Sequence, residues 1–185
     1  MLDFSSHEKF YSSLEIKPSL VISAVGYYED QNKAREIFDE TYKTVGVNYL
    51  GLMNLLNLIS LDFEKKHSGK IVVISSVAGL RGRQLNYIYG SAKAGIRIYL
   101  QGLRNKLHSK NVKITTILLG PVYTKMSAGH KLMPIITLKP EIAGKKIVEA
   151  SLKNKDEIYL HWIWKYIMLG IKIIPEFIFK RLPPF

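Results

Sequence analysis

Cysteine is absent from this 185-residue sequence. Disulfides, thiolate nucleophiles and metal sites with cysteine ligands are therefore excluded. The histidines show none of the spacings typical of metal ligands, so we predict no metal site. The chain also lacks a basic segment followed by an apolar run near its start, which argues against a secretory signal. These absences favour a protein of the cytoplasm.

Acidic residues are scarce: 15 Asp and Glu stand against 27 Lys and Arg, giving a formal net charge of +12. Nucleic acid, anionic lipid and a phosphate-bearing cofactor are all compatible with this charge, and so is a lysine surplus spread over solvated surface. The basic residues are scattered along the chain and form no dense stripe with aromatic residues. This distribution argues against a nucleic-acid-binding protein.

Short apolar runs alternate with longer segments of helical periodicity. The runs predict strands at 20–25, 70–76, 112–118 and 157–161. The first run is nearly continuous, so we expect it to be buried on both faces. Helices are predicted at 31–66, 87–108 and 140–152, the first as two helices or as one helix bent near 41–46. Strands separated by helix-length crossovers predict a doubly wound parallel α/β sheet.

Tyr89 and Lys93 lie four residues apart in the predicted helix 87–108. This spacing places both side chains on one helix face. A nearby ammonium group lowers the pKa of a phenol from its ordinary value of ~10, which prepares the hydroxyl for general acid or base chemistry. The same spacing occurs by chance in many helices, so the pair alone is only a hypothesis.

Ser76 and Asn48 are two further polar candidates. Ser76 ends the predicted strand 70–76, at the edge where open α/β sheets bind ligands. Its hydroxyl could donate to a substrate carbonyl, or it could satisfy a local amide. Asn48 lies in a mostly apolar helical stretch, where it could simply bind the backbone of a neighbouring strand. The occurrence of all four residues in this order is harder to attribute to chance than the occurrence of any one of them alone.

Three segments resemble the catalytic motifs of the short-chain dehydrogenase/reductase family: Ile74-Ser75-Ser76-Val77-Ala78-Gly79, the Tyr89/Lys93 pair, and Asn48-Tyr49-Leu50-Gly51. The match covers roughly residues 3–126. The resemblance implies a Rossmann-like fold and an NAD(P)-dependent oxidoreductase acting on a carbonyl/alcohol pair. Tyr89 would donate the proton, and Lys93 would lower its pKa and hold the nicotinamide ribose. Ser76 would polarise the carbonyl, Asn48 would hold a water molecule, and the cofactor would supply the hydride.

The cofactor-binding segments match the family less closely. An Asn-Asn-Ala-Gly segment appears here as Ser23-Ala24-Val25-Gly26, and a Pro-Gly segment as Leu119-Gly120-Pro121. Besides Tyr89 and Lys93, the resemblance assigns cofactor contacts to Asp3, Ala24, Gly26, Gly120, Val122 and Thr124. Asp3 would contact adenine, since 2–4 resembles the end of the family's third strand. NADP is preferred to NAD, because a basic protein suits an additional phosphate.

The family's opening strand, glycine-rich loop and helix have no counterpart in residues 1–30. We therefore expect the sheet to lack its first strands, with 20–25 as an uncovered edge. A truncated gene product, a split gene or a mis-assigned start would each account for this. We expect these 185 residues alone to bind a dinucleotide weakly. The alternative function is an inactive truncated remnant or an interaction subunit of such an enzyme.

The segment 161–185 mixes aromatic, aliphatic and basic residues, and we separate it from a partial dehydrogenase domain at 1–160. Its longest uncharged run, Tyr166 to Ile171, is far shorter than the ~20 residues of a spanning helix. The composition fits a segment lying in the membrane interface; the alternative is a helix covering the sheet or a dimer interface.

Together with 25–31, this tail resembles the bacterial branch that includes the reductase component of decaprenylphosphoryl-ribose epimerisation. In that branch the substrate is a lipid-linked sugar ketone. We therefore expect a small-molecule or lipid-linked carbonyl substrate and contact with a membrane surface through the tail. The protein would be cytoplasmic or peripheral to the membrane, and it could form a homo-oligomer.

Overall fold

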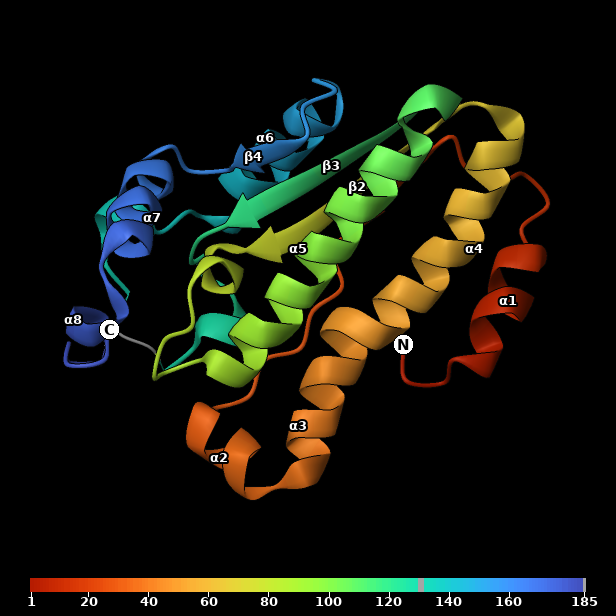
Figure 1. Ribbon diagram of the computed structural model, residues 1–185. Coiled ribbons are helices and arrows are strands. Elements are labelled where there is room, and N and C mark those ends of the chain that lie inside the picture. Colours follow the sequence, from red (N-terminus) through yellow and green to blue (C-terminus); the bar gives the residue numbers. More distant parts are fainter. Residues whose placement is uncertain (130–131, 185) are drawn as a thin grey trace.

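The computed structural model describes residues 1–129 and 132–184. A four-stranded parallel sheet with the order β1-β2-β3-β4 forms its centre. The strands are β1 (Leu20–Ser23), β2 (Gly69–Ser76), β3 (Val112–Leu119) and β4 (Glu157–Tyr159). Helices lie on both faces of this sheet (Figure 1), so the predicted doubly wound α/β architecture is confirmed.

The helices occupy most of the chain between the strands. They are α1 (Ser5–Ser12), α2 (Gln31–Glu36), α3 (Phe38–Val45), α4 (Gly51–Lys66), α5 (Tyr87–Leu107), α6 (Pro140–Ser151), α7 (Ile163–Ile173) and α8 (Glu176–Phe179). A π-helical turn, η1 (Gly46–Leu50), joins α3 to α4. Short 3₁₀ turns are η2 (Val77–Leu80), η3 (His108–Lys110), η4 (Lys125–Ser127) and η5 (Pro134–Ile136).

The predicted helical segment 31–66 is interrupted at Ile37, whose backbone is extended with φ −112° and ψ 105°. From Phe38 to Lys66 the chain continues as one helix that contains a π-helical turn at Gly46–Leu50, so the separation into two helices lies at Ile37 and not near 41–46. The Thr41 hydroxyl donates to the carbonyl of Ala34 across the break and holds α2 against α3. Two helices are present, but their boundary lies earlier than the sequence pattern indicates.

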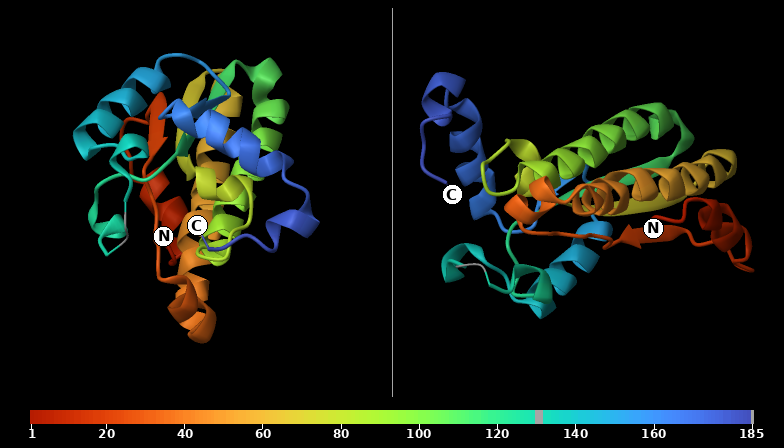
Figure 2. Two further views of the ribbon diagram at one scale, coloured as in Figure 1. Left: turned by 90° about the vertical axis from the view of Figure 1, so that its left-hand side faces the viewer. Right: turned by 90° about the horizontal axis from the view of Figure 1, so that it is seen from below.

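Two apolar layers hold the helices on the sheet. On one face, α4 and α5 pack against β2 and β3 through residues such as Leu56, Phe63, Ile96 and Ile71. On the other face, α6 packs against the same strands (Figure 2). The helix Phe38–Lys66 is long and apolar enough to cross a membrane. Its α4 part packs in the apolar layer against the sheet, as a core helix of a globular protein does.

The prediction that the first apolar run is buried on both faces is wrong for the edge strand β1. Leu20 is 37% exposed and Ile22 39% exposed, so this strand is not buried on both faces. The physical reason is its position: among the described residues β1 pairs with β2 alone, and α6 packs on β2 and β3 instead. The described part of the chain thus shows the uncovered edge that was expected at 20–25.

Charged side chains fix α5 on the sheet. Arg97 forms a bidentate ion pair with Glu157 of β4, through two hydrogen bonds of 2.6 and 3.0 Å. Arg104 donates to the backbone carbonyl of Ile114 in β3 at 2.9 Å. Both contacts are partly buried, where a bidentate guanidinium–carboxylate pair is most effective. They orient the whole of α5, and the amino-terminal half of this helix carries Tyr89 and Lys93.

Candidate active site

Ser76 is the last residue of β2 and lies at the carboxyl end of the sheet. Its Oγ accepts a hydrogen bond from the backbone N–H of Ala78 at 3.1 Å, which caps η2. The local capping role considered from the sequence is therefore confirmed. A serine hydroxyl that accepts through one lone pair still has its own hydrogen to donate. Capping is thus compatible with a second bond from Ser76 to a bound carbonyl oxygen.

Tyr89 and Lys93 share one face of α5, as their spacing predicts. Lys93 Nζ lies 5.7 Å from the centroid of the Tyr89 ring. The lysine is only 2% exposed, and its ammonium donates to the carbonyls of Ile74 at 3.3 Å and Val25 at 3.5 Å. An ammonium group has three N–H donors, and both of these bonds are long. Lys93 therefore keeps donor capacity for a ligand.

The pKa values in this site are governed by burial. Burial raises the pKa of Tyr89 to about 12, while the neighbouring Ser76 hydroxyl opposes the shift. Burial also lowers the pKa of Lys93 to about 8. The expected lowering of the Tyr89 pKa is therefore wrong for this structure, because loss of water around the phenol raises the pKa. At neutral pH the phenol is protonated, which is the form that can donate a proton.

Asn48 lies in the π-helical turn η1 and is fully buried. Its Nδ2 donates to the carbonyls of Tyr27 at 2.6 Å and Thr44 at 2.8 Å, and its Oδ1 accepts from the Tyr27 N–H at 3.3 Å. The alternative considered from the sequence, a bond to the backbone of a neighbouring strand, is met only in part: Asn48 does bind backbone, but its partners lie in the segment after β1 and in α3. π-helical turns of this kind occur frequently at functional sites. The proposed water held by Asn48 stays a prediction.

Two glycines allow η2 and α5 to touch through their backbones. A Cβ at Gly79 would lie 2.7 Å from the carbonyl carbon of Lys93, and one at Gly90 would lie 2.9 Å from the carbonyl oxygen of Ala78. The Ser75 hydroxyl adds a buried bond to the Lys93 carbonyl at 3.1 Å. These contacts set the position of Ser76 relative to Tyr89 and Lys93. The sequence motif contains Gly79, but only the packing shows why glycine is required.

Gly26 lies between Asn48 and Lys93. A Cβ at this position would be 3.6 Å from Asn48 Oδ1, 3.8 Å from Lys93 Nζ and 3.5 Å from Met126 Cε. All three are ordinary contact distances, so the space beside the Gly26 backbone is free of steric crowding. The structure thus joins Asn48, Lys93 and Gly26 in one site. Met126 of η4 reaches the same point, although no sequence pattern indicated it.

The structure gives less direct evidence on the other residues predicted to contact the cofactor. A Cβ at Gly120 would lie 2.1 Å from Trp164 Nε1, so the indole of α7 accounts for the glycine. Val122 pairs with Leu138, and Thr124 caps η4. Ala24 is exposed after the end of β1. The structure brings none of these four residues into contact with Lys93, and their cofactor roles stay predictions.

Asp3 lies in no strand. Its carboxylate accepts from the Ser5 hydroxyl at 2.6 Å and from the Ser6 N–H at 3.3 Å at the start of α1. The expectation that 2–4 resembles a strand end is thus not met, because the carboxylate instead satisfies the free N–H groups of a helix start. The adenine contact stays a prediction.

Polar groups gather around the start of α5. The Gln31 side-chain oxygen accepts from the N–H of Ile88 at 3.1 Å, and the Tyr28 ring packs edge-on against Tyr89 with centroids 5.2 Å apart. Three buried polar atoms in this region have no hydrogen-bond partner: Gln31 Nε2, Arg83 Nε and Asn86 Oδ1. Buried polar groups are normally satisfied, so these atoms give the site capacity to bind a polar ligand. Sequence reasoning missed all of them.

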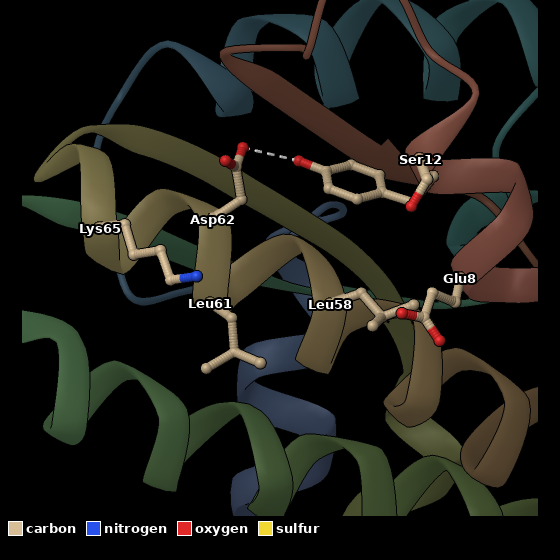
Figure 3. Close-up of a pocket in the computed structure, with 7 residues that line it drawn as sticks. Glu8, Ser12, Leu58, Leu61, Asp62 and Lys65 are labelled. Carbon is tan, nitrogen blue, oxygen red and sulfur yellow. Dashed lines mark hydrogen bonds between the residues drawn. The ribbon is translucent and has the colours of Figure 1, made fainter.

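A separate depression of about 200 Å³ lies between α1 and α4 (Figure 3). Of the two acids that line it, Asp62 accepts from the Tyr11 phenol at 2.8 Å and pairs with Lys66 at 2.7 Å. None of the predicted catalytic residues lines it. Within 1–129 and 132–184 no group of histidine, aspartate or glutamate residues could hold a metal ion; His130 lies outside the described residues.

Comparison with known proteins identifies the family. The model of the short chain dehydrogenase family matches residues 18–133, which include Asn48, Ser76, Tyr89 and Lys93. An uncharacterized oxidoreductase of Mycobacterium tuberculosis is 28% identical over 184 residues, 98% of this chain and 74% of its own length. A 3-oxoacyl-[acyl-carrier-protein] reductase of Chlamydia muridarum is 31% identical over 110 residues, 60% of this chain and 44% of its own.

Solved structures support the same fold. A short chain dehydrogenase from Burkholderia cenocepacia in complex with NADP superposes with a TM-score of 0.85 at 19% identity, covering 99% of this chain and 76% of its own. Serine dehydrogenase from Escherichia coli gives a TM-score of 0.72 at 20% identity, covering 85% of this chain and 71% of its own. Together with the matched family model, these findings show that the chain belongs to the short-chain dehydrogenase family.

Proposed function

We propose that the protein is an NAD(P)-dependent oxidoreductase that interconverts a carbonyl compound and its alcohol. The observation that carries the proposal is one small site at the end of β2. There the protonated phenol of Tyr89 lies beside the Ser76 hydroxyl, with the buried ammonium of Lys93 behind it. A phenol whose pKa is about 12 is a proton donor at neutral pH. In carbonyl reduction the oxygen must gain a proton, and the neighbouring Ser76 hydroxyl and Lys93 ammonium would favour release of that proton from the phenol.

Each side chain has a distinct role in this proposal. Tyr89 transfers its phenolic proton to the carbonyl oxygen as that oxygen becomes an alkoxide. Ser76 donates its hydroxyl hydrogen to the same oxygen and polarises the carbonyl. Lys93 is charged below pH 8 and stabilises the phenolate that Tyr89 leaves behind. Asn48 hydrogen-bonds to the backbone of Tyr27 and so fixes the segment after β1 that borders the site.

The residues present fit the nicotinamide-ribose end of a dinucleotide cofactor. Lys93 has an unused N–H donor, and the Gly26 backbone lies beside it, with room for contact at ordinary distances. When bound, the cofactor supplies the hydride. We propose NADP in preference to NAD. The net charge of +12 supports this choice, and the Burkholderia structure contains NADP.

The alternative of an inactive remnant or interaction subunit is not favoured. The family match, which spans the segments that carry all four proposed catalytic residues, and the closeness of Lys93 to Tyr89 and Gly26 support the interpretation of the chain as an enzyme. The expectation that these residues alone bind a dinucleotide weakly remains a prediction. It concerns affinity and does not change the assigned chemistry.

The substrate class is a carbonyl compound, either a free small molecule or one linked to a lipid. The lipid-linked form is supported by the apolar C-terminal segment, whose Trp164 packs on Gly120 at the end of β3. We propose that the protein is cytoplasmic, that it works at the membrane periphery, and that it forms a homo-oligomer.

A two-stage experiment tests the proposed function. NADPH and NADH binding to the purified chain is measured by fluorescence, and turnover is then followed with a panel of aldehydes and ketones. Tyr89→Phe should reduce turnover by about 10²–10⁴-fold and leave cofactor binding unchanged, because it removes only the proton donor. Tyr87→Phe, two residues away and 43% exposed, is the matched control. Turnover by Tyr89→Phe at the wild-type rate would contradict the proposal. If the purified chain does not bind NADPH or NADH at millimolar concentration, the result would support the alternative of an inactive truncated remnant.

A further inference from the structure

The helix α7 is apolar on two opposite faces. Trp164 and Met168 are buried against Val77 of η2 and Leu118 of β3, which accounts for one face. The opposite face carries an apolar stripe formed by residues at helical spacing that are 58–73% exposed: Trp162, Tyr166, Leu169 and Ile173. A helix that is apolar all round is normally covered on every side. The exposed stripe therefore indicates a surface that is covered in the functional state.

Exposed apolar residues also occur on α8, and α7 and α8 lie at one end of the molecule (Figures 1 and 2). Phe177 is 61% exposed and Ile178 43% exposed. Arg81 holds this geometry: it donates to the carbonyls of Lys172 at 3.3 Å and Ile174 at 3.2 Å, and pairs with Glu176 at 2.7 Å. The angle between α7 and α8 is thus fixed by bonds to the rest of the protein. The exposed apolar side chains belong to an ordered surface.

The basic side chains around the apolar stripe indicate which kind of partner covers this surface. The side chains of Lys165, Lys172, Lys180 and Arg181 are all exposed beside the apolar residues. The single acid of the described tail, Glu176, is already paired with Arg81. A twofold contact between two copies would bring these positive groups together, because such a contact uses the same patch on both subunits. An anionic lipid surface complements both the charge and the apolar stripe.

We propose that α7 and α8 dock the protein on an anionic bilayer, with the stripe in the interface and the four basic side chains at the lipid headgroups. The 11 residues of α7 extend for only about 16 Å, roughly half of a ~30 Å hydrocarbon core, so the helix lies on the membrane and does not cross it. Trp162 and Tyr166 suit the interface, since their rings are apolar with one polar group.

Docking has a consequence for the site. Arg81 follows η2, and Gln84 in the same loop donates to the carbonyl of Leu182 at 3.2 Å. This loop leads from Ser76 to Tyr89, so the docked tail places the candidate active site beside the bilayer surface. The docking proposal itself does not depend on the oxidoreductase activity, and it can be tested without a substrate.

The experiment is flotation of the purified chain with vesicles of phosphatidylcholine alone or with phosphatidylglycerol. The wild-type chain should float with anionic vesicles only, and the emission of Trp162 should shift to shorter wavelength. Leu169→Glu/Ile173→Glu should lose binding at least tenfold. The control Val148→Glu/Leu152→Glu introduces the same charge at positions on and just after α6 that are 55% and 68% exposed, and it should bind as the wild type.

A charge variant gives an independent test. Lys165→Gln/Lys172→Gln keeps the stripe and should weaken binding to anionic vesicles about thirtyfold, since each basic group near such a surface contributes ~1 kcal/mol. The proposal would be overturned if the stripe variant, Leu169→Glu/Ile173→Glu, bound anionic vesicles as well as its control, Val148→Glu/Leu152→Glu. So would a wild-type dimer that becomes monomeric in the stripe variant without any vesicle binding, because the surface would then join two copies of the chain.

Discussion

Replacing Lys93 with methionine should stabilise the fold and abolish turnover. Lys93 is 2% exposed, and burial lowers its pKa from 10.5 to about 8. A decrease of this size means that keeping the ammonium charged in the folded chain at pH 7 costs about 3 kcal/mol. Methionine fills similar volume without a charge, so no large cavity forms. The substitution removes the whole of this cost.

A smaller loss opposes the gain. The carbonyls of Ile74 and Val25 lose the bonds from Nζ, at 3.3 and 3.5 Å. Bonds this long contribute less than the ~1 kcal/mol of a typical hydrogen bond. The free energy of unfolding at pH 7 should therefore rise by about 1–2 kcal/mol in Lys93→Met. Functional residues commonly reduce stability in this way.

Urea unfolding at pH 7 and pH 9.5, followed by circular dichroism, checks this prediction. The folded-state pKa of Lys93 is lowered, so between about pH 8 and 10.5 the unfolded chain keeps a proton that the folded chain has lost. The stability of the wild type relative to the variant should therefore rise with pH in this window, by about 2 kcal/mol at pH 9.5. Lys145→Met, an exposed lysine on α6, is the control and should stay within ~0.5 kcal/mol of the wild type. A Lys93→Met variant that is less stable than the wild type at pH 7, or a stability difference that does not change with pH, would show that the buried ammonium does not destabilise the fold.

Three further predictions follow from the site. Gly79→Ala should destabilise the fold by more than ~2 kcal/mol and reduce turnover, since its Cβ would lie 2.7 Å from backbone of Lys93; thermal unfolding and turnover measure both. Asn48→Ala should cost about 3 kcal/mol in urea unfolding, because three hydrogen bonds to backbone are lost at a fully buried position; unchanged stability would contradict this. The rate of carbonyl reduction should be constant below about pH 8 and fall above it as Lys93 loses its charge, and a rate that rises there would contradict the role of the ammonium.

Sequence patterns predicted the elements whose signals are local. The run that became β2, the helical spacing of Tyr89 and Lys93, and the position of Ser76 at a strand end all depend on neighbours in the chain. The break at Ile37 was missed because it depends on a contact between Thr41 and Ala34 across two helices. The exposure of Leu20 and Ile22 depends on which helix covers which strand. Local periodicity does not contain that information.

The properties of the site were harder to predict than its residues. The sequence indicates that Lys93 lies near Tyr89, but it does not show that Lys93 is buried, that Tyr89 is partly buried, and that loss of water dominates both pKa values. Gly120 illustrates the same limit. Its motif suggested a cofactor contact, whereas the structure places the Trp164 indole against it. Trp164 lies 44 positions later in the numbering, and no spacing rule connects such positions.

The most direct measurement is the single-turnover rate of carbonyl reduction with NADPH held at saturation, in the wild type, Tyr89→Phe and Tyr87→Phe. Saturating cofactor removes differences in binding, so the rate reports the chemical step alone. Tyr89→Phe should slow this step by about 10²–10⁴-fold, while Tyr87→Phe should match the wild type. Equal rates in all three proteins would contradict the assignment of Tyr89 as the proton donor, and with it the central claim.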